Sequence, residues 1–482
     1  METLIKFQLI RKLRNMKKIP LALLNLLLIA APSISEMKRS LVSAFCCLLA
    51  LGLTPNLPAQ TFSDSNWISL GSGVNGPVYA LAVSGSNLYV GGSFTTAGGV
   101  PATNIAQWNG SYWTNLGSGI AQGGDYPNGN GVFALAVSGT NLYAGGSFIT
   151  AGGIPAASIA QWNGSYWSAL GSGMTGSPYG PAVQALAVSG TNLFAGGAFA
   201  RAGGVAVDNI ALWNGSYWTN LGEGVFGASD INVLALAASG SNLYVGGEFI
   251  DAGGLRGPVD YIAQWNGSNW ANVGSGTGVA VWALAVSGTD LYAGSEDAFT
   301  NGGGTTAEWN GSYWTNVGSG PPNLVRALAV SGNSLYAGGW FTNAGAVPAN
   351  YIAQWNGSSW SNLGSGMNNQ VDALAVSGNN LFVGGAFTMA GTNAVGYVAE
   401  AILPVPLAIL TTDGNFGFTN AGSSFGFDIS GSAGQTLMVQ GSSDLTNWIS
   451  LQTNAMSNSV WYFSDSTASN FTVRYYRAAL VQ

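Results

Sequence analysis

The stretch Ile105-Ala-Gln-Trp-Asn-Gly-Ser-Tyr-Trp-Thr-Asn-Leu-Gly-Ser-Gly119 recurs along the chain and decides its fold. Its first half contains a Trp-Asn-Gly phrase that is found six times, at Trp108, Trp162, Trp213, Trp265, Trp309 and Trp355. Its second half opens on a Trp-x-x-(Leu/Val)-Gly phrase, found at Trp67, Trp113, Trp167, Trp218, Trp270, Trp314 and Trp360. Asn-Gly between two β-rich runs predicts a hairpin with a type I′ turn, in which both central residues have positive φ. The stretch is therefore expected to form two antiparallel strands, each bearing a tryptophan.

A second phrase, Ala-Leu-Ala-Val-Ser-Gly (with Ala238 replacing Val in one copy), begins at Ala80, Ala134, Ala185, Ala235, Ala283, Ala327 and Ala373. Its copies start 44 to 54 residues apart. Periods of roughly 40–50 residues with several short strands in each are typical of propeller blades. In the first copy we expect four strands, at Val78–Ser84, Leu88–Gly92, Asn104–Trp108 and Tyr112–Gly117. The sequence predicts an all-β chain with a seven-bladed β-propeller over residues 61–402.

The two ends of the repeat region predict how the ring closes. The repeats open at Trp67 with only a fourth strand, and the last copy ends at Tyr397–Ile402, a third strand without Trp-Asn-Gly. The opening strand is therefore expected to complete the last blade, which removes free strand edges.

The pattern changes after Leu403-Pro-Val-Pro406. Short strands separated by Gly, Ser and Asn are expected at Phe416–Phe418, Ser424–Ile429, Thr436–Gln440, Trp448–Leu451, Val460–Phe463 and Thr472–Ala478. A chain of this length is just large enough for one core. Residues 403–482 are predicted to form a small β-sandwich.

Residues 1–60 are expected to be a leader region. Two segments in series have basic residues followed by an apolar run, and the second, from Met37, has a small residue suited to cleavage at Ala59. Because two export signals in series have no purpose, we expect Met37 to be the true start and residues 37–59 to be a signal peptide. A membrane anchor is the alternative, although each run is shorter than the roughly 20 residues that span a bilayer. The mature chain is therefore expected outside the cell or on its surface, without stable membrane insertion.

Charge and composition exclude several classes of function. From Thr61 onward there are 18 carboxylates against five arginines, and no lysine, histidine or cysteine. Nucleic acid is not an expected partner, because its phosphates need clustered cations. Disulfides, zinc sites and nucleophilic triads that use histidine are excluded as well.

Carboxylates are the remaining groups for chemistry, and they cluster in the middle copies at Glu223, Asp230, Glu248, Asp251, Asp260, Glu296 and Asp297. A carboxylate pair is the machinery of glycoside hydrolysis. The same groups suit calcium, which takes oxygen ligands from carboxylates and loop carbonyls. They occupy different positions of the repeat, however, and solvated loop charges are the plainer interpretation. We therefore expect no enzyme and no obligatory cofactor, with calcium as the alternative.

The phrases Leu88-Tyr-Val-Gly-Gly-Ser-Phe94, Asn104-Ile-Ala-Gln-Trp-Asn-Gly110 and Trp113-Thr-Asn-Leu-Gly-Ser-Gly119 resemble the repeat of the fungal cortical cell-polarity marker family and its secreted bacterial relatives. More distantly they resemble kelch and galactose-oxidase-like propellers. The resemblance covers residues 66–402 and implies a secreted or surface-displayed propeller with no activity. The copper site of galactose oxidases cannot be carried over, since the chain has no histidine. The region around Ser442-Ser-Asp-Leu-Thr-Asn-Trp448 resembles C-terminal modules of exported bacterial proteins.

Strand parity predicts a binding face. Loops after the second and fourth strands emerge on one side, and they are the long ones, which are the usual carriers of function on a rigid scaffold. Three loop aromatics, Tyr126, Tyr179 and Phe226, are candidates for stacking on sugar rings, and covering of blade edges explains them equally well.

One variable position inside a fixed phrase predicts a second candidate site. The residue before each Ala-Leu-Ala is Tyr79, Phe133, Gln184, Leu234, Trp282, Arg326 or Asp372. If the first strands line a central channel, these seven form a ring at its mouth, and Trp282, Arg326 and Asp372 fall on consecutive blades. An aromatic beside an ion pair suits a polar ligand. Packing between blades is the alternative.

These observations favour a non-catalytic binding, adhesion or scaffold protein with carbohydrate or protein as its partner. The competing classes are a carbohydrate-active enzyme with a carboxylate pair and a purely structural component of the cell envelope.

Overall fold

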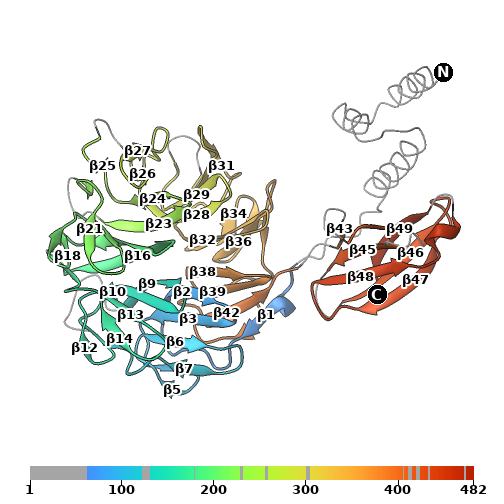
Figure 1. Ribbon diagram of the computed structural model, residues 1–482, viewed down its shortest axis with the longest axis horizontal. Helices are drawn as coiled ribbons and strands as arrows, with labels where there is room; N and C mark the ends of the chain where they lie inside the picture. Colours follow the sequence, from blue (N-terminus) through green and yellow to red (C-terminus); the bar gives the residue numbers. More distant parts are fainter. Residues whose placement is uncertain are drawn as a thin grey trace. The chain divides into compact units, whose positions relative to one another are not determined.

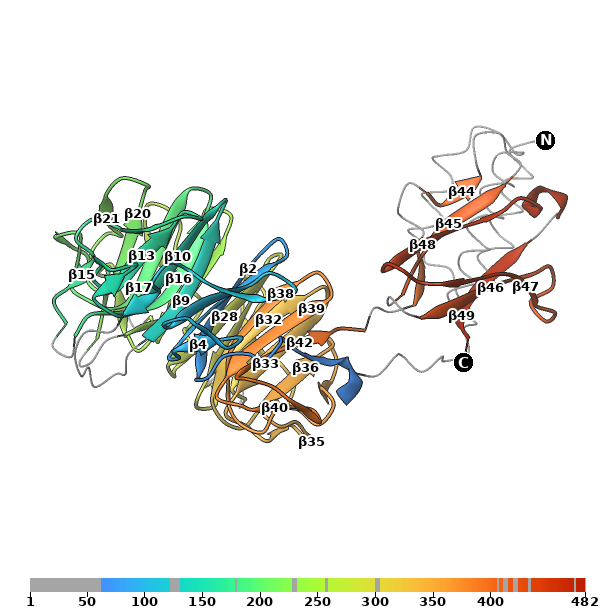
Figure 2. The same ribbon diagram turned by 90° about the horizontal axis from the view of Figure 1, so that it is seen from below.

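The computed structural model describes residues 62–121, 131–177, 180–227, 232–255, 259–299, 304–404, 407–410, 415–418, 424–431, 435–471 and 474–481. The described residues are nearly all strand and turn, and their helical segments are two short 3₁₀ turns, η1 (Asp64–Asn66) and η2 (Ala468–Asn470). They fall into two compact units, 62–403 and 404–481 (Figures 1 and 2). The predicted leader, with its start at Met37 and signal peptide at 37–59, lies outside the described residues.

Residues 62–403 form seven four-stranded antiparallel sheets within the described ranges. Numbered in chain order, the first four sheets are β2 (Val78–Ser84), β3 (Asn87–Gly92), β6 (Ile105–Trp108) and β7 (Trp113–Asn115); β9 (Gly131–Ser138), β10 (Asn141–Ser147), β13 (Ile159–Trp162) and β14 (Trp167–Ala169); β16 (Ala182–Ser189), β17 (Asn192–Ala198), β20 (Ile210–Trp213) and β21 (Trp218–Asn220); and β23 (Val233–Ser239), β24 (Asn242–Gly247), β26 (Ile262–Trp265) and β27 (Trp270–Asn272).

The other three sheets are β28 (Val281–Ser287), β29 (Asp290–Ser295), β30 (Thr306–Trp309) and β31 (Trp314–Asn316); β32 (Val325–Ser331), β33 (Ser334–Gly339), β36 (Ile352–Trp355) and β37 (Trp360–Asn362); and β38 (Val371–Ser377), β39 (Asn380–Gly385), β42 (Val398–Ile402) and β1 (Trp67–Ser69). In the seventh sheet β1 pairs with β42, so that Trp67 lies opposite Ala401. The opening strand of the unit therefore completes its last sheet.

The first strands of the seven sheets contact one another in sequence, and β38 returns to contact β2. Figure 1 shows these strands around the middle of the unit, with the later strands of each sheet outside them. This closed circuit of small sheets is an all-β, propeller-like fold.

Indole hydrogen bonds join each sheet to the one before it. The tryptophan that opens every fourth strand donates its Nε1–H to the backbone oxygen of the Leu or Val in the same phrase of the preceding sheet around the ring. The seven bonds are Trp113 to Leu70, Trp167 to Leu116, Trp218 to Leu170, Trp270 to Leu221, Trp314 to Val273, Trp360 to Val317 and Trp67 to Leu363, at 2.7–3.3 Å. These bonds satisfy the indole donors in the interior, as buried tryptophan requires, and fix where neighbouring sheets meet.

In six of the seven sheets a Gly-Gly pair lies at or next to the end of the second strand, where neighbouring sheets approach closely. A Cβ on Gly91 would come within 2.5 Å of Val132 Cγ1 on the next sheet, and one on Gly92 would collide with the backbone oxygen of Pro77. The pair is therefore required by packing and by the strand bend beside it.

The predicted type I′ turn at Asn-Gly is wrong. Gly110 has φ +94°, but Asn109 does not have positive φ, and Trp108 pairs with Trp113, which leaves a four-residue loop. The Asn109 Oδ1 accepts hydrogen bonds from the backbone N–H groups of Ser111 and Tyr112, at 3.0 and 2.9 Å. The asparagine side chain thus closes an Asx turn in place of the two-residue hairpin.

Small ribbons in the long loops were not predicted. In the first copy Ala97 pairs with Val100 around Gly98 and Gly99, which both have positive φ as a type I′ turn requires. The Gly-Gly dipeptide, rather than Asn-Gly, was therefore the type I′ signal. The ribbon strands are β4 (Thr96–Ala97), β5 (Val100–Pro101), β8 (Ile120–Ala121), β11 (Thr150–Ala151), β12 (Ile154–Pro155), β15 (Met174–Thr175), β18 (Arg201–Ala202), β19 (Val205–Ala206), β22 (Val225–Phe226), β25 (Asp251–Ala252), β34 (Asn343–Ala344), β35 (Val347–Pro348), β40 (Met389–Ala390) and β41 (Asn393–Ala394).

The second unit has two antiparallel sheets. One contains β43 (Ala408–Leu410), β44 (Gly417–Phe418), β45 (Phe425–Ser430) and β48 (Val460–Asp465), and the other β46 (Thr436–Ser442), β47 (Ile449–Ala455) and β49 (Tyr475–Leu480). Their shared core includes Phe427, Leu437 and Phe463. Inside the unit, Arg474 Nε lies 3.1 Å from Asp465 Oδ2, and both side chains are buried.

No helix within the described ranges is long and apolar enough to cross a bilayer.

Candidate ligand-binding site

The variable position before each Ala-Leu-Ala is a β-bulge. In the first sheet Val78 pairs with Gly92 and Ala80 pairs with Gly91, which leaves Tyr79 without a residue opposite it. The same shift occurs in the other six sheets, and the unpaired residues are Phe133, Gln184, Leu234, Trp282, Arg326 and Asp372. A bulge redirects its side chain and releases it from the packing of the ladder. Side chains of very different size and charge therefore fit here, while the flanking residues stay fixed.

Five of the seven bulge residues interact across sheet boundaries, and we call them the bulge belt: Trp282, Arg326, Asp372, Tyr79 and Phe133. The Arg326 guanidinium carbon lies 5.3 Å from the centre of the Trp282 ring. The Arg326 NH1 atom lies 3.1 Å from Asp372 Oδ1. On the first and second sheets, the Tyr79 and Phe133 rings are 5.7 Å apart. Gln184 and Leu234 occupy the equivalent bulges on the third and fourth sheets.

Asp372 is the buried member of the belt, with a side chain that is only 3% exposed. Burial raises its pKa, and the neighbouring Arg326 charge and hydrogen bonds from Gln370 and Arg326 oppose that rise. Gln370 Nε2 donates to both carboxylate oxygens, at 3.2 and 3.3 Å. A carboxylate this deeply buried is retained only with such partners.

Tyr79 links the two ends of the belt. Burial raises the pKa of its hydroxyl first, the negative charge of Asp372 raises it further, and Arg326 lowers it. The Tyr79 hydroxyl is therefore neutral, and it lies within electrostatic reach of the ion pair on the sixth and seventh sheets.

The belt offers two kinds of contact to a ligand. The Arg326 side chain is 37% exposed and uses one edge on Asp372, so its other N–H groups can donate elsewhere. The Trp282 indole lies beside it, and the Tyr79 and Phe133 rings pack on each other farther along the belt. Half-buried rings with directional donors suit a polar ligand that has an apolar face. The alternative of packing between sheets fits the buried Asp372, whereas the Arg326 side chain is partly exposed.

The carboxylates singled out as a possible catalytic pair or calcium site are dispersed, and Asp230 lies outside the described residues. Glu248 Oε2 accepts a hydrogen bond from Asn232 Nδ2 at 3.4 Å, whereas Glu223 lies beside Gly254. In the described part of the chain, no three carboxylates gather closely enough to hold a metal ion. Glu296 and Asp297, which are neighbours in the sequence, line a common cavity. Calcium binding stays a prediction.

Of the three loop aromatics, Tyr126 and Tyr179 lie outside the described residues. Phe226 belongs to β22, where it lies opposite Asp251 of β25 and is half-buried. Its backbone oxygen accepts a hydrogen bond from Ile250 N–H.

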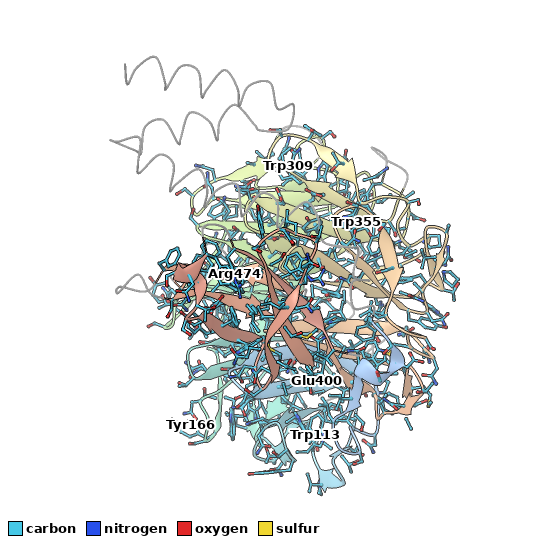
Figure 3. The ribbon with its side chains drawn as sticks, turned by 90° about the vertical axis from the view of Figure 1, so that its right-hand side faces the viewer. Trp113, Tyr166, Trp309, Trp355, Glu400 and Arg474 are labelled. Atoms are coloured by element: carbon cyan, nitrogen blue, oxygen red, sulfur yellow. The ribbon has the colours of Figure 1, made fainter. Side chains whose placement is uncertain are left out.

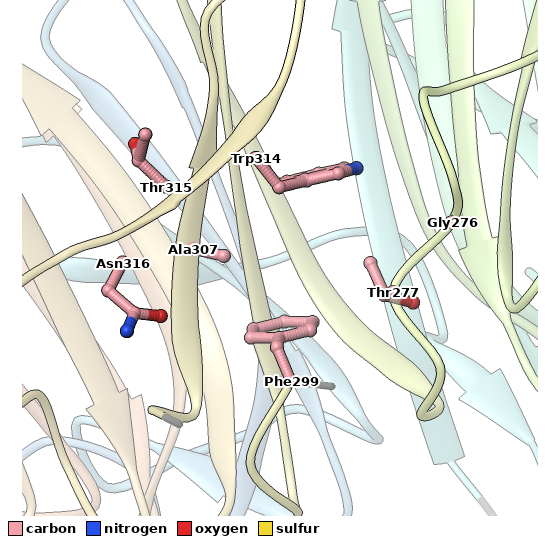
Figure 4. A pocket seen from close by; sticks show the side chains of 7 residues that line it. All are labelled: Gly276, Thr277, Phe299, Ala307, Trp314, Thr315 and Asn316. Atoms are coloured by element: carbon pink, nitrogen blue, oxygen red, sulfur yellow. The ribbon is translucent and has the colours of Figure 1, made fainter. Parts of the chain in front are cut away.

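The cavity beside Glu296 and Asp297 was not predicted. It has a volume of about 480 Å³ and includes the exposed Trp340. The signal in the sequence was that Trp340 belongs to neither of the recurring tryptophan phrases. A second cavity, lined by Phe299, Trp314 and Thr277 among others, measures about 10 Å³, which leaves room for no more than a water molecule (Figure 4).

No family model and no curated protein matches the chain. Among solved structures it is similar to the computationally designed Ika8 protein, at 17% identity over 70% of this chain and 99% of that one, with a TM-score of 0.41. It is also similar to BBS1N in complex with ARL6DN, at 11% identity over 70% and 97% of the chains, with a TM-score of 0.36. A Pyrococcus horikoshii acylaminoacyl peptidase is 8% identical over 77% of this chain and 59% of that one, with a TM-score of 0.39. At such scores the likenesses indicate no activity. The chain has an all-β, propeller-like fold, which is defined by its own closed circuit of sheets.

Proposed function

We propose that this chain is an exported, non-catalytic binding protein, and that it holds carbohydrate or a protein partner on the face where the bulge belt lies. In this proposal each of the seven sheets is one blade of a seven-bladed β-propeller, and residues 404–481 form a β-sandwich. The recurring phrases support kinship with the fungal cortical cell-polarity marker repeat and, more distantly, with kelch repeats. The leader-like residues 1–60 support export.

The contact between Trp282, Arg326 and Asp372 carries the proposal. The three residues come from consecutive sheets and occupy a position at which other copies have Leu or Gln, so the fold itself does not require an ion pair there. Burying a carboxylate is unfavourable unless it is paired. An aromatic, a partly exposed guanidinium and a fixed carboxylate placed together are therefore better explained by a ligand than by stability.

Absence of the usual catalytic groups supports binding over turnover. The chain has no histidine, and from Thr61 onward no lysine or cysteine. The belt carboxylate, Asp372, is buried against Arg326 and does not face a second carboxylate in the belt. The alternative is a carbohydrate-active enzyme, and it is favoured by Glu296 and Asp297, which line one cavity. That alternative predicts that sugar is released.

The proposal is tested by binding assays on the secreted chain, with a glycan array and with capture of surface proteins from its own cells. Trp282→Ala and Arg326→Met/Asp372→Asn, which removes the pair without leaving a buried charge, should each weaken binding at least 10-fold. Tyr313→Ala, which removes an exposed ring at the turn between β30 and β31, is the matched control and should bind normally. Thermal melts check that all variants fold. Unchanged binding by both belt variants, or release of reducing sugar, would contradict the proposal.

A further inference from the structure

We infer that Trp340 is the platform of a separate sugar subsite, which takes a neutral pyranose ring in the cavity between the fifth and sixth sheets. The inference rests on the proposed binding function and narrows its ligand to carbohydrate, but it depends on residues outside the bulge belt.

The cavity is formed by loops of two neighbouring sheets. The loop after β29 supplies Glu296, Asp297 and Ala298, and the segment before β32 supplies Pro322, Asn323 and Leu324. Trp340, Phe341 and Thr342, which follow β33, and Tyr351 complete the lining. Its volume of about 480 Å³ falls within the range of roughly 300–1,000 Å³ that small-molecule sites occupy.

Strand register places this cavity at the same end of the sheets as the belt. Val325 pairs with Gly339, and Arg326 is the unpaired residue next to Val325. Trp340, which follows Gly339, therefore lies close in the register to the Arg326 bulge. The backbone N–H of Trp340 donates a hydrogen bond to the backbone oxygen of Leu324 at 2.8 Å, which holds the two loops together. In the fifth sheet Val281 pairs with Ser295, and Glu296 follows at once. The cavity and the belt therefore lie toward the same end of these two sheets.

Trp340 is not explained by packing. It is 60% exposed, whereas the seven tryptophans that bridge the sheets lie in the interior or at its margin. The equivalent position after the Gly-Gly pair holds small or polar residues in other copies, namely Ser93, Ser147, Ala198, Glu248 and Ala386. The other copies have a small or polar residue here, and an exposed tryptophan gains little of the stabilisation that burial of an aromatic gives. Its exposed face is available for a ligand.

The polar groups around the indole indicate a sugar. The C–H face of a pyranose packs on an aromatic ring, while its hydroxyls donate to carboxylates such as Glu296 and Asp297 and bond the amide of Asn323. The ten lining residues include two carboxylates and no arginine or lysine. Anionic glycans would be repelled by this lining, whereas a neutral sugar would not.

A peptide is the competing occupant, because tryptophan is also enriched in protein interfaces. Interface centres are depleted of charged residues, however, and this cavity places two carboxylates beside its aromatic. The concave, polar lining therefore favours a sugar, and peptide binding becomes an outcome of the test.

The test titrates the full secreted chain with neutral oligosaccharides (gluco-, manno-, xylo- and chito-oligomers) and with uronate oligomers, by calorimetry. Neutral oligomers should bind and uronate oligomers should not. Trp340→Ala should weaken binding at least 10-fold, Trp340→Phe should weaken it less, and Asp297→Asn should weaken it without affecting the melting temperature. Tyr313→Ala, which truncates an equally exposed ring of the fifth sheet, should leave affinity unchanged.

The outcomes separate this inference from the proposed function. If neutral sugars bind and only the belt variants lose affinity, the belt is the site and the Trp340 subsite is wrong. If only the Trp340 variants lose affinity, the subsite stands and the belt proposal fails. Failure of the wild-type chain to bind any neutral oligomer, or capture of a protein that depends on Trp340, overturns the sugar inference.

Discussion

At the scale of single residues, an indole hydrogen bond recurs at all seven boundaries between sheets. Trp218 donates to the Leu170 oxygen at 2.9 Å in a buried setting. Trp218→Phe keeps much of the apolar contact but leaves that oxygen without its donor, which costs about 1–3 kcal/mol. Denaturant unfolding should show a loss in this range. The adjacent Tyr217→Phe, at an exposed ring, should fall within about 0.5 kcal/mol of wild type. Equal stabilities of the two variants would refute this role for the indole.

A second residue-scale prediction concerns Glu400 of β42 (Figure 3). Four of the other six sheets have glutamine at the equivalent position, for example Gln107 and Gln161. Burial raises the pKa of the Glu400 carboxyl above 4.5, so the folded chain binds this proton more tightly than the unfolded chain. Stability is therefore lost as pH rises from about 4.5 through the raised pKa. Glu400→Gln should remove that loss and stabilise the protein slightly at pH 7, as thermal melts across pH 4–8 can measure. A wild-type pH profile retained in the variant would contradict the assignment.

At the scale of the element, the bulge and the Gly-Gly pair opposite it are one unit. Gly91→Ala places a methyl group against Val132 of the next sheet, and overpacking of this kind typically costs about 1–3 kcal/mol. Gly85→Asn is the control, because Gly85 has positive φ but open space around it, and asparagine tolerates that conformation. In chemical denaturation, the free energy of unfolding of Gly91→Ala should be well below that of Gly85→Asn. The reverse order would mean that backbone conformation, and not the approach of the sheets, selects these glycines.

The sequence predicted strands correctly where a local pattern alone determines the structure. It failed at turns where a side chain makes hydrogen bonds in place of the backbone. The apolar run Val78–Ser84, which recurs in every copy and ends at a Ser-Gly turn, was enough to place the first strand of each sheet. The Asn109 turn was mispredicted because the asparagine side chain accepts the hydrogen bonds that a type I′ backbone would have made. The Trp340 cavity could not be foreseen, since its walls come from loops of two sheets whose approach is a tertiary property.

At the scale of the whole molecule, the ring depends on its first few residues. Besides β1, this segment places Asp64 so that it accepts hydrogen bonds from Ser365 N–H and Oγ–H at 2.6 and 2.7 Å. A chain starting at Asn75 loses these contacts and the Trp67 indole bond, and it exposes the edge of β42. Its melting temperature should fall by several degrees relative to a chain starting at Thr61. Identical melting temperatures would show that β1 does not stabilise the circuit. Trp67→Phe is a milder variant, and its melting temperature should lie between those of the chains starting at Asn75 and at Thr61.

We expect the pairing of β1 with β42 to form late in folding, because its partners are far apart in the sequence. Trp67 and Leu363 are 296 residues apart, and Asn66 reaches Ile402 across 336. Entropy of loop closure grows only with the logarithm of that separation, but contacts so distant in sequence form slowly. We therefore expect β1 to stay unpaired until the rest of the circuit has formed. During that interval β1 of one molecule can pair with β42 of another, so refolding at high protein concentration should yield an exchanged dimer beside the closed monomer.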